Sequence, residues 1–307
     1  MSRTWRLAVA LAINVALVAG QVVAGVISHS AGLLADAGHN LTDVAAVGLS
    51  LVAVRWALRP RSANRSYGNH RGTILAALAN AAVLAVVTVA IAAVGIVRLL
   101  HPTHVDGGVV AAVAGAAVVA NGLAAWALHE GDRDLNMRSA VLHMVSDLAA
   151  SAVVAAAGVA IVVAGGGGWE RADPVASLVV AALVLVEAVR IAKESADVLL
   201  ESTPPDVDLA ALRRSMTATP GVGEVHDLHV WSLSSEYRAL SAHLVLTGHP
   251  TLEEAQAVGN VVRAGVSDPF GIAHATFELE CERCDDELDD PCAVDDAHVV
   301  PHQVAGA

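Results

Sequence analysis

Residues 73–99 read TILAALANAAVLAVVTVAIAAVGIVRL, and this run contains a single charged side chain, Arg98. A helix needs about 20 mostly apolar residues to cross the hydrocarbon core of a bilayer. Five further runs meet this requirement, at 7–28, 31–56, 107–129, 138–165 and 174–196. The sequence therefore predicts an α-helical membrane protein with six transmembrane helices.

The basic residues favour one orientation of these helices. Lysine and arginine concentrate in cytoplasmic loops next to transmembrane helices. The segments before the first run, between the second and third, between the fourth and fifth, and at the end of the sixth are basic, whereas the alternate connections hold only Arg98 and Arg171. Both termini are therefore expected in the cytoplasm. A plasma membrane is favoured, because no organelle signal is evident.

The charge of the chain is concentrated behind the apolar runs. Residues 206–307 contain 18 acidic residues and five arginines, and this difference accounts for the net charge of −13. Such an acidic balance argues against nucleic acid as a partner. We expect a transmembrane transport domain at 1–203, a cytoplasmic metal-binding and dimerisation domain at 204–284, and an acidic, disordered tail at 285–307.

The cytoplasmic domain shows the pattern of a small α+β fold. Helical segments are predicted at 208–219 and 251–266, where Thr-Leu-Glu-Glu at 251–254 has the form of a capping box. Alternating apolar and polar residues predict strands at 222–233, 237–246 and 272–281. The order αββαβ predicts two helices on one face of a three-stranded sheet.

Two of the apolar runs carry a histidine and an aspartate four residues apart. His39 and Asp43 lie in one, and His143 and Asp147 lie in the other. This spacing places both side chains on one helix face, so two such helices offer the four ligands of a tetrahedral zinc site. The alternative is that each His–Asp pair bonds internally or lines a water-filled cavity. Asp36 faces roughly the same way, and we interpret it as a structural hydrogen-bond acceptor. The alternative is an accessory cation or proton site.

The cytoplasmic domain contains a second group of metal-binding residue types. His226 and His243 lie on adjacent predicted strands and can meet across the hairpin. Cys281 and Cys284 have chelating spacing, although a Cys-x-x-Cys pair is also typical of redox proteins. The nearby histidines and carboxylates favour metal binding.

Several motifs together resemble the cation diffusion facilitator family, in its zinc-transporting form. They lie at 30–43, 142–147, 173–178, 199–204, 225–231 and 241–243, so the resemblance spans nearly the whole chain. It implies a six-helix homodimer that exchanges cytoplasmic zinc for protons through a site between the second and fifth helices. The implied transport ligands are His39, Asp43, His143 and Asp147.

The same resemblance implies a metallochaperone-like cytoplasmic domain that binds further metal near the dimer interface. Our hypothesis is that this metal is zinc and acts as a regulatory ligand. The matching positions are His226, His243, His274, Glu280, Cys281 and Cys284. We therefore expect a Zn²⁺/H⁺ antiporter that lowers cytoplasmic zinc, and not an enzyme. The alternatives are transport of another divalent metal (Co, Fe, Mn, Ni or Cd), a membrane metalloenzyme, or a metal sensor without transport.

Overall fold

The computed structural model of the chain describes residues 3–129, 135–165, 168–235 and 237–282, without the side chains of 3–13 and 127–143. The chain forms two compact units, and the division falls between Ala196 and Asp197. The domain boundary proposed from the sequence, at 203/204, lies a few residues later. The proposed acidic tail, at 285–307, lies outside the described residues.

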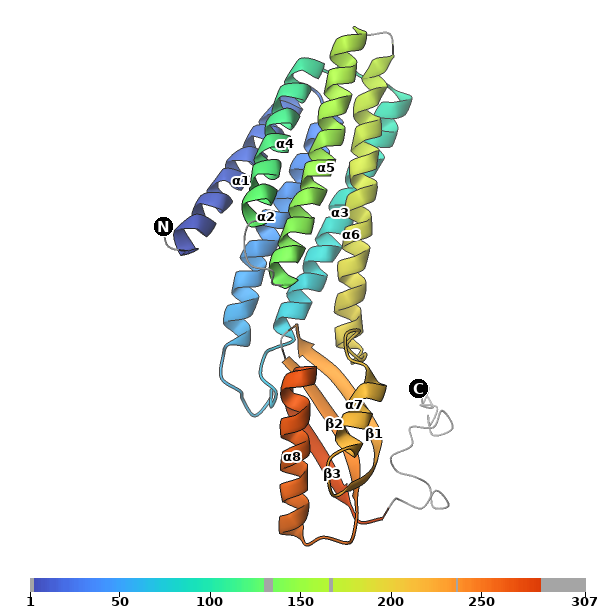
Figure 1. Cartoon of the computed structure of the whole chain (residues 1–307). Helices are drawn as coiled ribbons and strands as arrows, with labels where there is room; N and C mark the ends of the chain where they lie inside the picture. Colours follow the sequence, from blue (N-terminus) through green and yellow to red (C-terminus); the bar gives the residue numbers. More distant parts are fainter. Residues whose placement is uncertain (1–2, 130–134, 166–167, 236, 283–307) are drawn as a thin grey trace, which may run out of the picture. The chain divides into compact units, whose positions relative to one another are not determined.

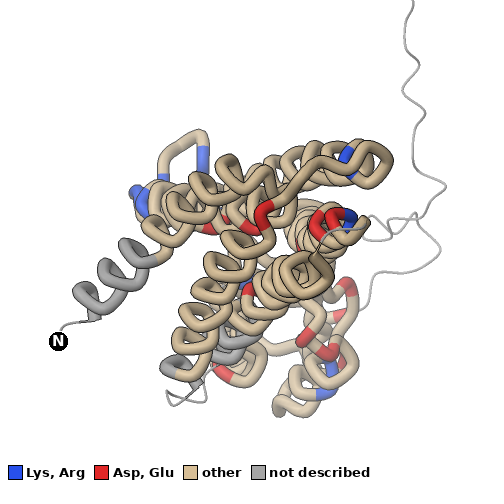
Figure 2. Tube along the Cα trace, turned by 90° about the horizontal axis from the view of Figure 1, so that it is seen from above, with Lys and Arg blue, Asp and Glu red and all other residues tan. Residues whose placement is uncertain are grey.

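The first unit is a bundle of helices that lie side by side (Figure 1). Their bounds are α1 (Arg3–Ile27), α2 (Ala31–Ala57), α3 (Gly72–Leu100), α4 (Gly107–His129), α5 (Leu135–Ala164) and α6 (Ala172–Leu199), with a short 3-10 turn, η1 (Trp169–Arg171), before α6. Each helix overlaps one predicted run. Uncharged residues predominate along them in Figure 2.

Among the described residues, the five helices α2 to α6 are each long and apolar enough to cross a membrane. In α1 the side chains are described only from Asn14 onward, and this apolar part, Asn14–Ile27, is shorter. The prediction of a helical membrane domain is confirmed.

The helices α4 and α5 pack closely at two glycines. A methyl group added to Gly158 of α5 would lie 2.6 Å from the backbone nitrogen of Ala111 in α4. One added to Gly107 would lie 2.8 Å from the carbonyl oxygen of Gly158. Small residues at such positions let membrane helices pack backbone against backbone.

The second unit contains α7 (Leu209–Thr217), β1 (Val222–Ser234), β2 (Tyr237–Leu246), α8 (Leu252–Phe270) and β3 (Ile272–Glu280). The strand order in the sheet is β1-β2-β3, with β1 antiparallel and β3 parallel to β2. This is the predicted αββαβ order, and the prediction of a small α+β domain is confirmed.

One apolar core joins both helices to one face of this sheet. Leu212 of α7 and Val262 of α8 pack in it with Leu240 and Leu244 of β2. Successive side chains on a strand point to opposite faces, so His243 lies on the face away from the helices. That face is where the polar cluster described below forms.

The helix α8 begins as the sequence predicts and ends later than predicted. The Thr251 hydroxyl accepts from the backbone N–H of Glu254, and the Glu254 carboxylate accepts from the backbone N–H of Thr251. The bond from Thr251 lowers the pKa of Glu254. The predicted end at 266 is wrong, because Pro269 is accommodated in the last turn and the helix stops at Gly271, whose φ is +65°.

Candidate metal centres

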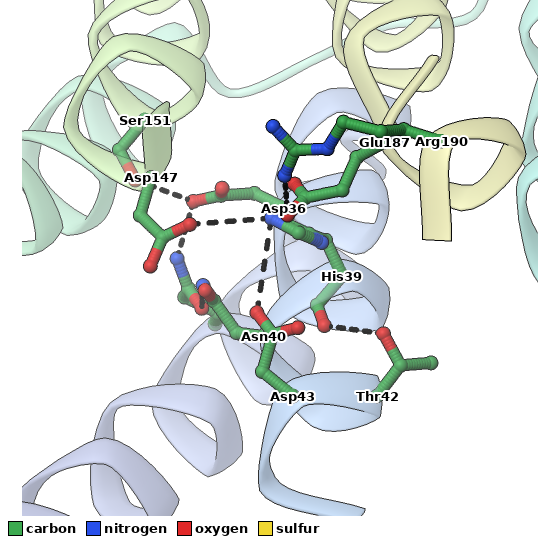
Figure 3. A network of polar contacts seen from close by, with 10 residues as sticks. Asp36, His39, Asn40, Thr42, Asp43, Asp147, Ser151, Glu187 and Arg190 are labelled. Carbon is green, nitrogen blue, oxygen red and sulfur yellow. Dashed lines mark hydrogen bonds and ion pairs between the residues drawn. The ribbon is translucent and has the colours of Figure 1, made fainter. Parts of the chain in front are cut away.

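Three of the predicted transport ligands are near one another inside the membrane unit (Figure 3). His39 Nε2 lies 3.7 Å from Asp43 Oδ2 and 3.3 Å from Asp147 Oδ1. One ligand atom from each residue lies within 4.8 Å of the others. The side chains of His39 and Asp147 are each 5% exposed, whereas that of Asp43 is 21% exposed.

The helix geometry explains this convergence. Asp43 lies four residues after His39 in α2, so the two side chains share one face. Asp147 reaches them from α5, which packs against α2. His143 belongs to α5, one turn before Asp147, but its side chain lies outside the described residues.

The spacing of these atoms suits zinc. Zinc binds nitrogen and oxygen ligands at about 2.0–2.2 Å, so the ligand atoms of a tetrahedral site lie about 3.4 Å apart. The distances of 3.3 and 3.7 Å measured from His39 Nε2 are close to this value. One buried and one half-buried carboxylate beside one imidazole also form an environment that favours a divalent cation.

A buried polar network adjoins these ligands in Figure 3. Asp36 Oδ2 accepts from Gln21 Nε2 of α1 at 2.5 Å and from Ser151 Oγ of α5 at 2.9 Å. Gln21 Oε1 in turn accepts from Asn40 Nδ2 at 3.1 Å. Asp36 lies one turn before His39, and Ser151 one turn after Asp147. The network therefore fixes α1, α2 and α5 beside the candidate site.

The cytoplasmic cluster gathers on the sheet face opposite the helices. His226 of β1 pairs with His243 of β2 in the strand register, and their ring centroids are 5.0 Å apart. Glu280 of β3 contacts both, with Oε2 2.8 Å from His226 Nε2 and Oε1 2.7 Å from His243 Nδ1. These three residues form the second group that could hold a metal ion.

Two further carboxylates, neither predicted from the sequence as a ligand, adjoin His243. Asp227 Oδ2 and Glu278 Oε2 each lie 3.5 Å from His243 Nε2. Asp227 occupies a bulge in β1 between His226 and His229, with a φ of +45°. Glu278 could have been predicted from the sequence, because alternation along a strand places it on the same sheet face as Glu280.

The remaining predicted ligands do not join this group in the described residues. His274 lies six residues before Glu280 on β3, which separates them by about 20 Å along the strand. Grouping His274 with Glu280 in one site is therefore not supported by the geometry. Cys281 follows the end of β3 and is exposed, and Cys284 lies outside the described residues.

Comparison with family models places two known domains on the chain. The model of the cation efflux transmembrane domain matches residues 7–200. The model of the cation efflux protein cytoplasmic domain matches residues 204–281.

Curated relatives match over most of their length. The zinc transporter ZitB of Escherichia coli is 38% identical over 283 residues, covering 91% of this chain and 88% of that protein. The cadmium, cobalt and zinc/H(+)-K(+) antiporter of Bacillus subtilis is 32% identical, covering 85% and 84%. The metal cation efflux system protein CzcD of Cupriavidus metallidurans is 33% identical, covering 91% and 87%.

Among solved structures, the metal-bound C-terminal domain of the CzcD transporter matches with 36% identity and a TM-score of 0.22. It covers 24% of this chain and 99% of that one.

Proposed function

This chain belongs to the cation efflux family, also called the cation diffusion facilitators, and on that premise we propose that it exports zinc from the cytoplasm in exchange for protons. The observation that carries the proposal is the convergence of His39, Asp43 and Asp147 from two membrane helices within 4.8 Å. The names of the relatives support zinc as the metal and protons as the coupling ion.

The proposed transport site consists of His39, Asp43, His143 and Asp147. His143 is assigned by its spacing in α5, where it precedes Asp147 by one turn as His39 precedes Asp43. Zinc needs deprotonated imidazole nitrogens and ionised carboxylates, so protons compete with the metal for the same atoms. Zinc therefore loads from the cytoplasm, the site reorients, and protons release the metal on the other side.

We place both termini and residues 204–284 in the cytoplasm of a cell with this protein in its plasma membrane. The support is the alternation of basic and non-basic connections along the sequence. In this orientation the start of α2 faces outward, and the end of α6 faces the cytoplasm.

The cytoplasmic domain binds regulatory zinc and contributes to a homodimer. His226, His243 and Glu280 form the proposed first zinc position, and Asp227 and Glu278 flank it. Cys281 and Cys284 stay candidates for additional ligands. His243→Ala in the full-length chain is expected to lower the bound zinc per protomer and to weaken the dependence of transport on cytoplasmic metal. Unchanged zinc content and metal dependence would remove this assignment.

Zinc flux into proteoliposomes with an imposed pH gradient tests the transport function. The wild type is expected to move zinc only with the gradient, and Asp43→Ala is expected to lose that flux. Glu194→Ala is the matched control, because it removes an exposed carboxylate of α6 that contacts Arg190. Flux retained in Asp43→Ala contradicts the site. Flux of cobalt or cadmium without flux of zinc would assign the transporter to that other metal. A folded wild type that moves no metal would favour the alternative of a metal sensor without transport.

A further inference from the structure

A buried carboxylate joins the starts of two membrane helices that are far apart in sequence. Asp173, in the first turn of α6, is fully buried. Its Oδ2 accepts from the backbone N–H of Ala31 at 2.7 Å, and its Oδ1 accepts from that of Gly32 at 3.1 Å. The Ser30 hydroxyl, also fully buried, donates to Asp173 Oδ1. Asp173 thus caps the first turn of α2 from another helix.

This cap complements the one that α2 already has. The first backbone N–H groups of a helix lack partners within the helix. Ser30 Oγ accepts from the N–H of Leu33 at 3.0 Å, and Asp173 satisfies those of Ala31 and Gly32. A carboxylate at the positive end of a helix gains further from the helix dipole. Ser30, Ala31 and Asp173 are buried in the protein, so water does not replace these bonds while the contact is formed. The start of α6 therefore leaves α2 only when water enters between them.

Packing around the cap leaves little space at Gly32. A methyl group there would lie 3.0 Å from Asp173 Oδ1 and 3.3 Å from Val154 Cγ1 of α5. Three helices, α2, α5 and α6, are therefore closely packed at this position.

The contact between Ser30, Gly32 and Asp173 lies toward the start of α2 from the candidate transport ligands. Between Ser30 and His39, the side chains of Leu33, Ala35 and Asp36 are at most 1% exposed. The cavity beside His39, between α2, α3 and α6, has a volume of about 10 Å³, which is room for about one water molecule. On the other side of His39, Asp43 is 21% exposed. The ligands are thus covered by buried side chains toward Ser30, and toward Asp43 they adjoin the most exposed of the three side chains, whose Oδ2 is itself buried.

We propose that Asp173 is a positioning residue of the transport cycle, which holds the start of α6 on α2 and closes the transport site toward the outside. The inference rests on the transport function and orientation proposed above. Zinc loading from the cytoplasm takes place with this contact formed, and release to the outside requires it to break and admit water.

Side-specific labelling of a thiol introduced by Ala35→Cys tests the proposal. Ala35 is 1% exposed and lines the cavity beside His39. A membrane-impermeant maleimide is added to the outside of intact cells that express Ala35→Cys alone or with Asp173→Asn, Ser30→Ala or Asp106→Asn. The parent without Ala35→Cys supplies the background.

Asp106→Asn is the matched control, because Asp106 Oδ1 caps the first turn of its own helix, α4, at Gly108 and Val109. Labelling is expected to rise about tenfold with Asp173→Asn, the factor that corresponds to one lost charge-assisted hydrogen bond. Ser30→Ala is expected to raise it less, and Asp106→Asn to leave it unchanged.

Equal labelling of folded Ala35→Cys proteins with and without Asp173→Asn overturns the proposal, as does an equal rise with Asp106→Asn. If Asp173→Asn does not fold, Ser30→Ala decides in the same way. Zinc flux of the wild type is measured separately. Absent flux with Asp173-dependent labelling rejects the transport function, whereas normal flux with Asp173-independent labelling rejects only the closure.

Discussion

Substitutions at Asp36 can separate the contribution of a buried carboxylate's hydrogen bonds from the contribution of its charge. Both donors, Gln21 Nε2 at 2.5 Å and Ser151 Oγ at 2.9 Å, point to the same oxygen, Oδ2. The other oxygen, Oδ1, is buried without a hydrogen-bond partner. An asparagine with its carbonyl oxygen in the place of Oδ2 keeps both bonds, whereas alanine keeps neither.

The expected cost follows from this count. A hydrogen bond to a charged group contributes about 1.5–3 kcal/mol, and its loss leaves a buried donor unpaired. Asp36→Ala is therefore expected to lower the free energy of unfolding by about 3–6 kcal/mol. Asp36→Asn is expected to stay within about 1 kcal/mol of wild type, since the weaker bonds are offset by removal of a buried charge.

Equilibrium unfolding in mixed micelles with increasing SDS measures both variants, and zinc flux in proteoliposomes is measured on the same preparations. Asp36→Asn is expected to keep the flux of the wild type, and Asp36→Ala to lose it together with stability. Ser151→Ala, which removes one donor, should fall between them in stability. If Asp36→Asn loses as much stability as Asp36→Ala, the reasoning from the two hydrogen bonds is refuted. If it is stable but does not transport, the charge of Asp36 takes part in transport.

Two further predictions concern helix packing and helix capping. Gly158→Ala is expected to lower stability in the same SDS titration by about 1–3 kcal/mol, because the new methyl group meets the backbone of Ala111. Gly115→Ala should leave the stability unchanged, because a methyl group at Gly115 meets nothing within 4 Å. Equal unfolding midpoints for the two variants would contradict the close approach of α4 and α5. The lowered pKa of Glu254 means that its contribution to stability is complete above the ordinary carboxyl pKa and is lost as pH falls through the lowered one. The difference in thermal midpoint between wild type and Glu254→Gln should therefore shrink on acidification, and a constant difference would argue against the capping box as its source.

The helices were predictable because hydropathy is a local property of the chain. The pairing of His39 with Asp43 was also predictable, since both lie on one helix face. The meeting of these residues with Asp147 in one place depends on how α2 and α5 pack, which the spacing suggests but does not determine.

Two contacts between separate segments were not predictable from the sequence. The Ser30–Asp173 bond spans 143 positions, and Asp227 reaches His243 only because a bulge turns β1 at that residue. The grouping of His274 with Glu280 fails for the opposite reason. Both residues lie on one strand face, but a strand extends too far over six residues for them to share a small ion.

The length of α6 means that a small rotation at its start moves its other end by a large distance. Its 28 residues, Ala172–Leu199, form one helix about 42 Å long. Its one proline, Pro174, lies in the first turn, where no internal hydrogen bond is lost, so the helix has no proline hinge along its length. A rod of this length that tilts by about 10° displaces its far end by about 7 Å. A rotation of this size about the contact with Asp173 therefore moves Leu199, the last residue of α6, by several ångströms.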